Sequence, residues 1–292
     1  MKIKISIAFI KLMSLFPLNV ARNIGKVLGY CAYLANSRMY KTSLTNLQLC
    51  FPDLSSQERK ILARKSLMHT GMMLAECGSV WLWPVEKILR KIEDVEGADL
   101  LQNARDLGKG VVIIGPHHGN WELVGLYLSA LGKISLLYQT PKHKDLDALL
   151  TMARSRGRAK LYPARTKGVA AILSALKHGE MVGILPDQTP GLKAGEFAPF
   201  FGNDAYTMTL ISRLIQKTGA KAFLVYAKRT GKGFKIVIKE SDNDIYAEHM
   251  PTSLIGLNKT VELAVKDAPE QYQWEYKRFR HQPEGKQEPY KA

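Results

Sequence analysis

The chain has 292 residues, 46% of them hydrophobic, which is enough to bury the core of one large domain or of one domain with an appended segment. Its formal net charge of +16 predicts acidic partners, namely nucleic acid, anionic lipid or an acidic carrier protein, although an ordinary basic surface remains an alternative. The sequence lacks zinc-finger cysteine spacing, an aromatic nucleic-acid-binding signature and a basic low-complexity arm, which argues against nucleic acid. Three scattered cysteines exclude a disulfide framework and a cysteine metal site, and they fit a reducing compartment.

Residues 1–36 form the most apolar part of the chain. Lys2, Lys4 and Lys11 interrupt the first apolar run, and Pro17 separates it from the second. Neither run has the roughly 20 uninterrupted apolar residues of a spanning helix, and no signal-peptide cleavage site follows. We therefore expect a retained N-terminal membrane-anchoring or interfacial helical segment at 1–36 and a larger domain at 37–292. A helix of the soluble core is the alternative.

Between residue 37 and the middle of the chain, two segments carry clear signals. Ser55 and Glu58 have the spacing of a capping box, which predicts a helix from there to Met73. Trp81 and Trp83 follow, and they suit either a lipid-facing groove or the core. A short strand at 92–95 and a helix at 98–107 then lead into the central stretch.

The central stretch, residues 111–122, carries the polar residues of most interest. Four β-branched residues at 111–114 predict a strand that is covered on both faces, and Gly115 and Pro116 end it. The apolar spacing of 121–131 predicts a helix. His117, Asn120 and Glu122 therefore lie at the carboxyl end of a buried strand, where α/β sheets bind ligands.

His117 and Glu122 have a spacing that suits acid–base chemistry. Four residues separate them, so the two side chains are expected to meet across the turn. The carboxylate would then hold one imidazole nitrogen and leave the other free to take a proton from an alcohol. No Gly-x-Ser-x-Gly motif occurs in the chain and no cysteine lies in this stretch, so the attacking hydroxyl is expected to belong to the substrate.

The rest of the chain alternates between strands and helices. This alternation predicts an α/β fold whose mixed, mostly parallel central sheet is flanked by helices, with the N-terminal membrane-associated helix added to it. The last two strands are expected to form a hairpin at the sheet edge. The predicted strands are 133–138, 181–185, 221–228 and 234–239, and the predicted helices are 145–156, 169–178, 207–218 and 250–268.

Three further side chains are candidates for binding substrate. The guanidinium groups of Arg154 and Arg165 suit a phosphate or carboxylate, although each arginine also fits a solvated basic helix end. Asp187 follows the strand at 181–185, so it reaches the same sheet edge as His117 if their two strands are parallel neighbours. Its open roles are to hold Arg154, to contact sugar hydroxyls, or to cap the next turn.

These residues resemble a known family. His117, four intervening residues and Glu122 look like the His-x4-acid signature of the glycerolipid acyltransferase superfamily. The sequence His-His-Gly-Asn-Trp-Glu at 117–122 is similar to the form in bacterial lipid A biosynthesis acyltransferases. Arg154-x-x-Gly, Pro-Asp-Gln around Asp187 and the aromatic segment at 197–207 resemble the later blocks of the same family. The resemblance covers nearly the whole chain and is strongest from 111 to 204.

The resemblance implies transfer of a fatty acyl chain from acyl carrier protein to a lipid A precursor, at a 3-hydroxyacyl hydroxyl on a phosphorylated glucosamine disaccharide. It implies that His117 is the general base, that Glu122 fixes its tautomer, and that Arg154 and Asp187 position the acceptor. Asn120 and Arg165 complete the expected substrate-binding residues, and Asn120 is also expected to support the turn. The implied location is the cytoplasmic face of the bacterial inner membrane, against anionic lipids, with no metal or redox cofactor.

Three alternatives to this function remain open. The acceptor can be a lysophospholipid, a glycolipid or an ornithine lipid, with the same residues in the same roles. The chain can be a basic membrane-surface binding protein, although the presence of both His117 and Glu122 counts against a degenerate site. A hydrolase, with water in place of the acceptor, is the third alternative.

Overall fold

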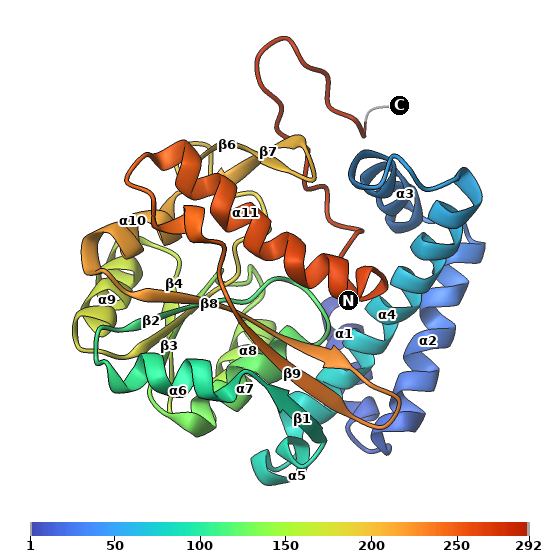
Figure 1. Cartoon of the computed structure of the whole chain (residues 1–292). Coiled ribbons are helices and arrows are strands. Elements are labelled where there is room, and N and C mark those ends of the chain that lie inside the picture. The colour runs from blue at the N-terminus through green and yellow to red at the C-terminus, as the bar shows by residue number, and fades with distance from the viewer. Residues whose placement is uncertain (1, 291–292) are drawn as a thin grey trace.

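The computed structural model describes residues 2–290, and a seven-stranded mixed sheet lies at its centre (Figure 1). The strand order is β1-β9-β8-β2-β5-β3-β4, in which only β8 and β9 pair antiparallel. This confirms the predicted α/β fold with a mostly parallel mixed sheet. The strands are β1 (Ile92–Glu96), β2 (Val111–Ile114), β3 (Ile134–Tyr138), β4 (Ala159–Pro163), β5 (Met181–Ile184), β8 (Lys221–Arg229) and β9 (Phe234–Glu240).

Strand β2 lies in the middle of the sheet and is fully buried, as its four β-branched residues predict. Val111 and Ile113 belong to the core on one face, whereas Val112 and Ile114 belong to the core on the other. Helices α6 (Ala98–Asp106), α7 (Trp121–Leu131) and α8 (Lys144–Arg154) cover the first face. Helices α9 (Thr166–Lys177), α10 (Leu210–Thr218) and α11 (Met250–Asp267) cover the second.

The first four helices stand together at one side of the sheet, and the fifth lies next to β1 (Figure 1). The capping box of Ser55 and Glu58 is present and starts α4, which continues past the predicted end. Helix α2 crosses α4 with its backbone in contact, because a Cβ at Gly25 would lie 2.3 Å from the Gly71 carbonyl oxygen. These helices are α1 (Lys2–Met13), α2 (Leu18–Leu34), α3 (Arg38–Cys50), α4 (Ser56–Leu82) and the short α5 (Val85–Leu89).

The outer surface of α1, α2 and the turn between them keeps large apolar side chains exposed, including Leu12, Leu15, Val27 and Leu34. Within residues 2–290, no helix has both the length and the apolar character needed to cross a membrane. The inner side chains of the same helices, such as Met13, are buried against α4. Membrane association of this segment therefore stays a prediction, and the exposed apolar surface is the feature on which it rests.

Several predicted details are wrong. The β8–β9 hairpin is not at the sheet edge, because β1 pairs parallel with β9 outside it. The edge strand β4 and a separate two-stranded sheet of β6 and β7 were not predicted, and α10 begins at Leu210 because β7 occupies the residues before it. The remaining elements are β6 (Gly195–Phe200), β7 (Asn203–Met208) and two 3₁₀ helices, η1 (Asn243–Tyr246) and η2 (Pro269–Gln271).

Candidate active site

The turn at 115–120, which joins β2 to α7, is held tightly against the end of β8. The Gly119 amide donates to the Gln271 carbonyl over 2.9 Å, and the Asn120 amide donates to the Ala227 carbonyl over 2.8 Å. Gly119 has φ +57°, and a Cβ there would lie 2.0 Å from the Ala227 oxygen. Only glycine fits this backbone, so the turn presents His117 from a fixed position.

His117 is bound by Asp187 through two hydrogen bonds. The His117 backbone amide donates to Asp187 Oδ2 and the ring Nδ1 to Oδ1, each over 2.9 Å. Burial opposes ionisation of Asp187, but the interaction with His117, including both hydrogen bonds, outweighs it and lowers the pKa of the carboxyl. An ionised carboxylate only accepts, so Nδ1 carries a proton, and the neutral form of the ring keeps its lone pair on Nε2. Nε2 hydrogen-bonds no residue in the range 2–290.

This arrangement follows from the sheet, because β2 and β5 are parallel neighbours and their carboxyl ends meet. The conditional expectation that Asp187 reaches the edge of His117 is confirmed. The expectation that Glu122 holds the imidazole is wrong, because Asp187 occupies Nδ1. Asp187 does not hold Arg154, whose partner is Glu122.

Glu122 binds Arg154 and Trp81. Arg154 Nε donates to Glu122 Oε2 over 2.9 Å, its Nη2 donates to Oε1, and Trp81 Nε1 donates to Oε2 over 3.1 Å. Burial opposes ionisation of Glu122, but Arg154 outweighs it and lowers the pKa of the carboxyl. The forked pair fixes the guanidinium plane, and Nη1 hydrogen-bonds no described residue. Arg154 therefore keeps Nη1, which carries two N–H donors, for a ligand.

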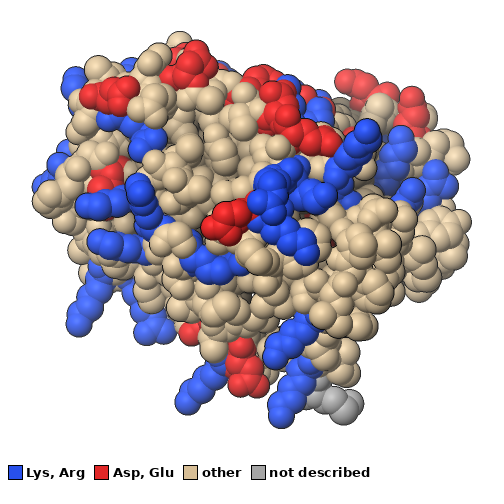
Figure 2. Space-filling model, turned by 90° about the horizontal axis from the view of Figure 1, so that it is seen from below, with Lys and Arg blue, Asp and Glu red and all other residues tan. Residues whose placement is uncertain are grey.

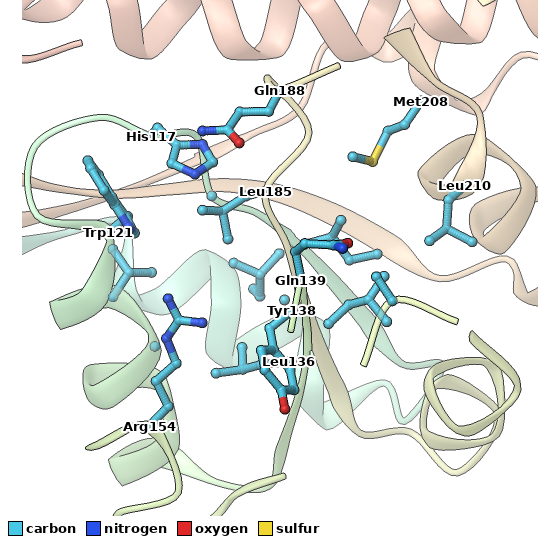
Figure 3. A pocket seen from close by; sticks show the side chains of 18 of the residues that line it. His117, Trp121, Leu136, Tyr138, Gln139, Arg154, Leu185, Gln188, Met208 and Leu210 are labelled. Carbon is cyan, nitrogen blue, oxygen red and sulfur yellow. The ribbon is translucent and has the colours of Figure 1, made fainter. Parts of the chain in front are cut away.

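A cavity of about 870 Å³ lies beside these residues. His117, Trp121 and Arg154 lie along one side of it, opposite Met208 and Leu210 (Figure 3). Trp81 and Glu122 line it as well, whereas Trp83 does not. Its apolar walls come from the cores on both faces of the sheet, and they include Leu126, Leu128, Leu136, Leu137, Leu150 and Ile184. A long hydrocarbon chain fits such walls.

Asn120 and Arg165 were predicted to bind substrate, and the structure does not bring either to this cavity. Asn120 is fully buried, with its Nδ2 donating to Glu76 Oε2 over 2.8 Å and its Oδ1 accepting the Leu123 amide at the start of α7. Its predicted role in supporting the turn is confirmed. Arg165 is exposed at the N-terminal boundary of α9.

His118 packs into the core and does not line the cavity. It is fully buried, and its Nε2 lies 3.0 Å from the Ala268 carbonyl, so Nε2 carries the proton. Burial lowers the pKa of His118 to about 4, and the ring is therefore neutral near pH 7. The two neighbouring histidines thus differ, because one faces the cavity and the other packs into the core.

Two residues near the turn were not predicted at all, Glu76 on α4 and Arg229 at the end of β8. Arg229 donates to both carboxylate oxygens of Glu76, over 3.0 and 2.8 Å, and to the Gly119 carbonyl over 2.9 Å. Neither residue belongs to a motif, and 153 residues separate them in sequence. No sequence signal could have paired them. Among residues 2–290, no group of three His, Cys, Asp or Glu is arranged to hold a metal ion.

The site combines an imidazole with a free lone pair, a fixed guanidinium and an apolar cavity. This combination suits base-assisted attack by a hydroxyl on a carbonyl carbon that carries a long chain. Within residues 2–290, the ring of His117 contacts Asp187 and Trp121 rather than a serine or cysteine, so this part of the chain offers the base no nucleophile of its own.

Comparisons with known proteins agree with this chemistry. Residues 2–281 match the family model described as bacterial lipid A biosynthesis acyltransferase. The chain is 31% identical over 276 residues to the lipid A biosynthesis lauroyltransferase of Escherichia coli (strain K12), covering 92% of this chain and 88% of that protein. The palmitoleoyltransferase of the same organism is 29% identical, with the same coverage. Its myristoyltransferase is 25% identical over 86% of this chain and 78% of its own length.

Proposed function

The chain belongs to the bacterial lipid A biosynthesis acyltransferases, and we propose that it transfers a fatty acyl chain from acyl carrier protein to a hydroxyl of a 3-hydroxyacyl chain on a phosphorylated glucosamine-disaccharide lipid A precursor. Family membership shows that it is an enzyme of acyl transfer in lipid A biosynthesis. The donor and the acceptor hydroxyl are parts of the proposal. The observation that carries it is His117, oriented by Asp187 at the wall of an apolar cavity.

The proposed reaction begins when His117 Nε2 takes the proton of the acceptor hydroxyl. The hydroxyl oxygen attacks the thioester carbonyl carbon, and the tetrahedral intermediate breaks its C–S bond. The imidazolium, stabilised by Asp187, returns the proton to the leaving thiolate. Arg154 Nη1 is the donor we propose for the oxyanion or for an acceptor phosphate, and Glu122 holds it in place.

The proposals of an acyl carrier protein donor and of a membrane location rest on the positive charge of the surface and on its exposed apolar side chains. Lysine and arginine spread over much of the face shown in Figure 2, where aspartate and glutamate are fewer. This excess suits an acidic carrier protein and anionic lipid headgroups. The exposed apolar side chains of α1 and α2 suit the acyl region beneath those headgroups. We therefore propose that the enzyme acts at the cytoplasmic face of the bacterial inner membrane.

Replacing Leu12 and Leu15 with Gln should weaken binding to anionic vesicles. The two side chains are 50% and 77% exposed, so folding does not depend on their burial. Each leucine that enters the bilayer contributes about 1.5–3 kcal/mol, so the pair should change the partition coefficient by at least about tenfold. Vesicle co-sedimentation measures this. The control is Leu107→Gln at the C-terminal boundary of α6, where the side chain is 63% exposed. Equal binding by all proteins would contradict a membrane role for α1 and the turn after it.

Replacing Gly125 with Leu should shorten the preferred acyl chain. Gly125 lines the cavity from α7, and a Cβ there would lie 3.3 Å from Leu136 Cδ1, so a larger side chain fills space available to the donor. Each displaced methylene costs about 0.8 kcal/mol, roughly a factor of four in affinity. Competition among donors of increasing length measures the preference. Gly231→Leu, in open space at the β8–β9 turn, is the control, and an unchanged preference would place the acyl chain elsewhere.

The identity of the acceptor is tested with wild-type protein and labelled acyl carrier protein donor. A tetra-acylated lipid A precursor and lysophosphatidic acid compete in one reaction, and a parallel reaction contains no lipid. The proposal predicts acylated disaccharide as the main product. Preference for the lysolipid would move the enzyme to another acceptor, and equal release of free fatty acid without lipid would identify a hydrolase.

A further inference from the structure

Glu76 lies at the centre of a buried ion cluster that the proposed mechanism does not use. Its side chain is fully buried on α4. Arg22 of α2 donates from Nε to Glu76 Oε1 over 2.6 Å, and Arg229 donates to the same carboxylate from the end of β8. Arg22 also donates to the Thr230 carbonyl over 3.0 Å and to the Gly233 carbonyl over 2.8 Å. The cluster therefore joins an N-terminal helix, α4 and the β8–β9 turn.

The cluster reaches the turn of His117 at two points. Asn120 Nδ2 donates to Glu76 Oε2 over 2.8 Å, and Arg229 Nη2 donates to the Gly119 carbonyl over 2.9 Å. Asn120 is the third residue after His117, and it caps the helix that carries Glu122. A displacement of Asn120 would move the base and the start of α7 together.

Two arginines face one carboxylate in this cluster, and stability alone explains such an arrangement poorly. Desolvation of buried ions is costly, and apolar replacements of buried ion pairs are often neutral or stabilising. Burial lowers the pKa of Arg229, even though Glu76 raises it. Three backbone carbonyls accept from the two guanidinium groups, which offsets part of the surplus positive charge. The cluster does fix the orientation of the two donors that bind at the turn, Asn120 Nδ2 and Arg229 Nη2.

We propose that Glu76 is a positioning residue for acyl transfer, because its carboxylate, bound between Arg22 and Arg229, fixes Asn120 and thereby holds His117 and the start of α7 in the geometry needed for reaction. The inference rests on the proposed function, since acyl transfer is its readout. It also gives α2 a role beyond its apolar surface, because Arg22 connects that helix to the turn.

Asn120→Ser tests the connection with the smallest disturbance. Serine caps a helix about as well as asparagine, so α7 keeps its N-cap, while the donor to Glu76 is lost and the ion cluster remains. Misplacement of a catalytic group by about 1 Å can cost as much as 10²-fold, so we expect kcat to fall about tenfold or more. The KM for the acyl donor should stay within about twofold, because the cavity walls are untouched.

Glu76→Gln tests the carboxylate itself, with Glu86→Gln on the exposed surface of α5 as the matched control. We expect Glu76→Gln to lower kcat at least as much as Asn120→Ser, and the double variant to be no worse than Glu76→Gln alone, because both changes cut one connection. Glu86→Gln should match wild type. All rates are measured at a temperature where thermal unfolding shows each protein to be folded, and Asn120→Ser decides the matter if Glu76→Gln does not fold.

The outcomes separate the inference from the proposed function. A wild-type protein that transfers no acyl group to any acceptor overturns both. An active wild type with an equally active Asn120→Ser overturns the inference alone, as does a variant that loses thermal stability but keeps its kcat while folded. A fall in kcat with an unchanged KM, shared by Asn120→Ser and Glu76→Gln, is the result we expect.

Discussion

Asp187→Asn is expected to lower kcat for acyl transfer by about 10²-fold or more, with little change in the KM for the acyl donor. The carboxylate accepts the Nδ1 proton of His117, which leaves the Nε2 lone pair free to act as a base. An amide group that donates to Nδ1 would instead place the ring proton on Nε2, and it carries no charge to stabilise the imidazolium. Asp187 lies behind His117 and does not line the cavity, so substrate binding should persist.

A second substitution, Glu122→Gln, distinguishes the role of Glu122 from that of Asp187. This change removes the charge and one of the two acceptors that hold Arg154. It leaves the tautomer of His117 unaltered, because Glu122 binds Arg154 and Trp81. We expect its effect to be no larger when Arg154→Gln is added, since both changes remove one guanidinium from its place. If Glu122→Gln and Asp187→Asn instead formed the non-additive pair, Glu122 would act on the imidazole and the assignment made here would be wrong.

His117→Gln is expected to lower the turnover rate by about 10²–10⁴-fold, the loss typical for removal of a general base. Glutamine retains a group that can donate to Asp187 from about the same place, and the lost Nε2 has no partner among residues 2–290, so the fold should survive. Steady-state transfer to the lipid acceptor measures the loss, and circular dichroism confirms that the variant is folded. His178→Gln, a change of an exposed histidine at the C-terminal boundary of α9, should behave as wild type. Turnover by His117→Gln close to that of wild type would exclude His117 as the base.

The sheet and its central strand could be predicted because their signals are local. The four β-branched residues from Val111 to Ile114 predict a strand covered on both faces, and all four are buried in the structure. The capping box of Ser55 and Glu58 likewise predicts the start of α4. Strand β4 gives a weaker signal because it is an edge strand, in which only Ala159 is fully buried.

The partners of the site residues could not be predicted, because they depend on which strands are neighbours. His117 and Glu122 are close in sequence, yet each binds a residue from a distant element. Asp187 is 70 residues from His117 and Arg154 is 32 residues from Glu122. The sequence spacing suggests that Glu122 binds the imidazole of His117. Asp187 binds it instead, because β5, which precedes Asp187, is the parallel neighbour of β2.

The N-terminal helices show the same limit. Their apolar composition predicts a helical segment that lies at a membrane or in the core, and the structure shows helices whose inner side chains, such as Met13, are buried against α4. The close crossing of α2 over α4 depends on Gly25, Gly29 and Gly71, where a Cβ on any of the three would lie 2.0–2.3 Å from a backbone oxygen of the other helix. Contacts of this kind involve pairs of helices, so neither sequence segment reveals them alone.

A double-mutant cycle tests directly whether Asp187 acts through His117. The quantity measured is the single-turnover rate of transfer from acyl-acyl carrier protein to a lipid A precursor. The four proteins are wild type, His117→Gln, Asp187→Asn and the double variant. If Asp187 acts only through His117, the double variant should be no slower than His117→Gln alone. If the loss of rate in the double variant equals the product of the two single losses, Asp187 acts independently of His117. That result would contradict the proposal that Asp187 orients the catalytic base.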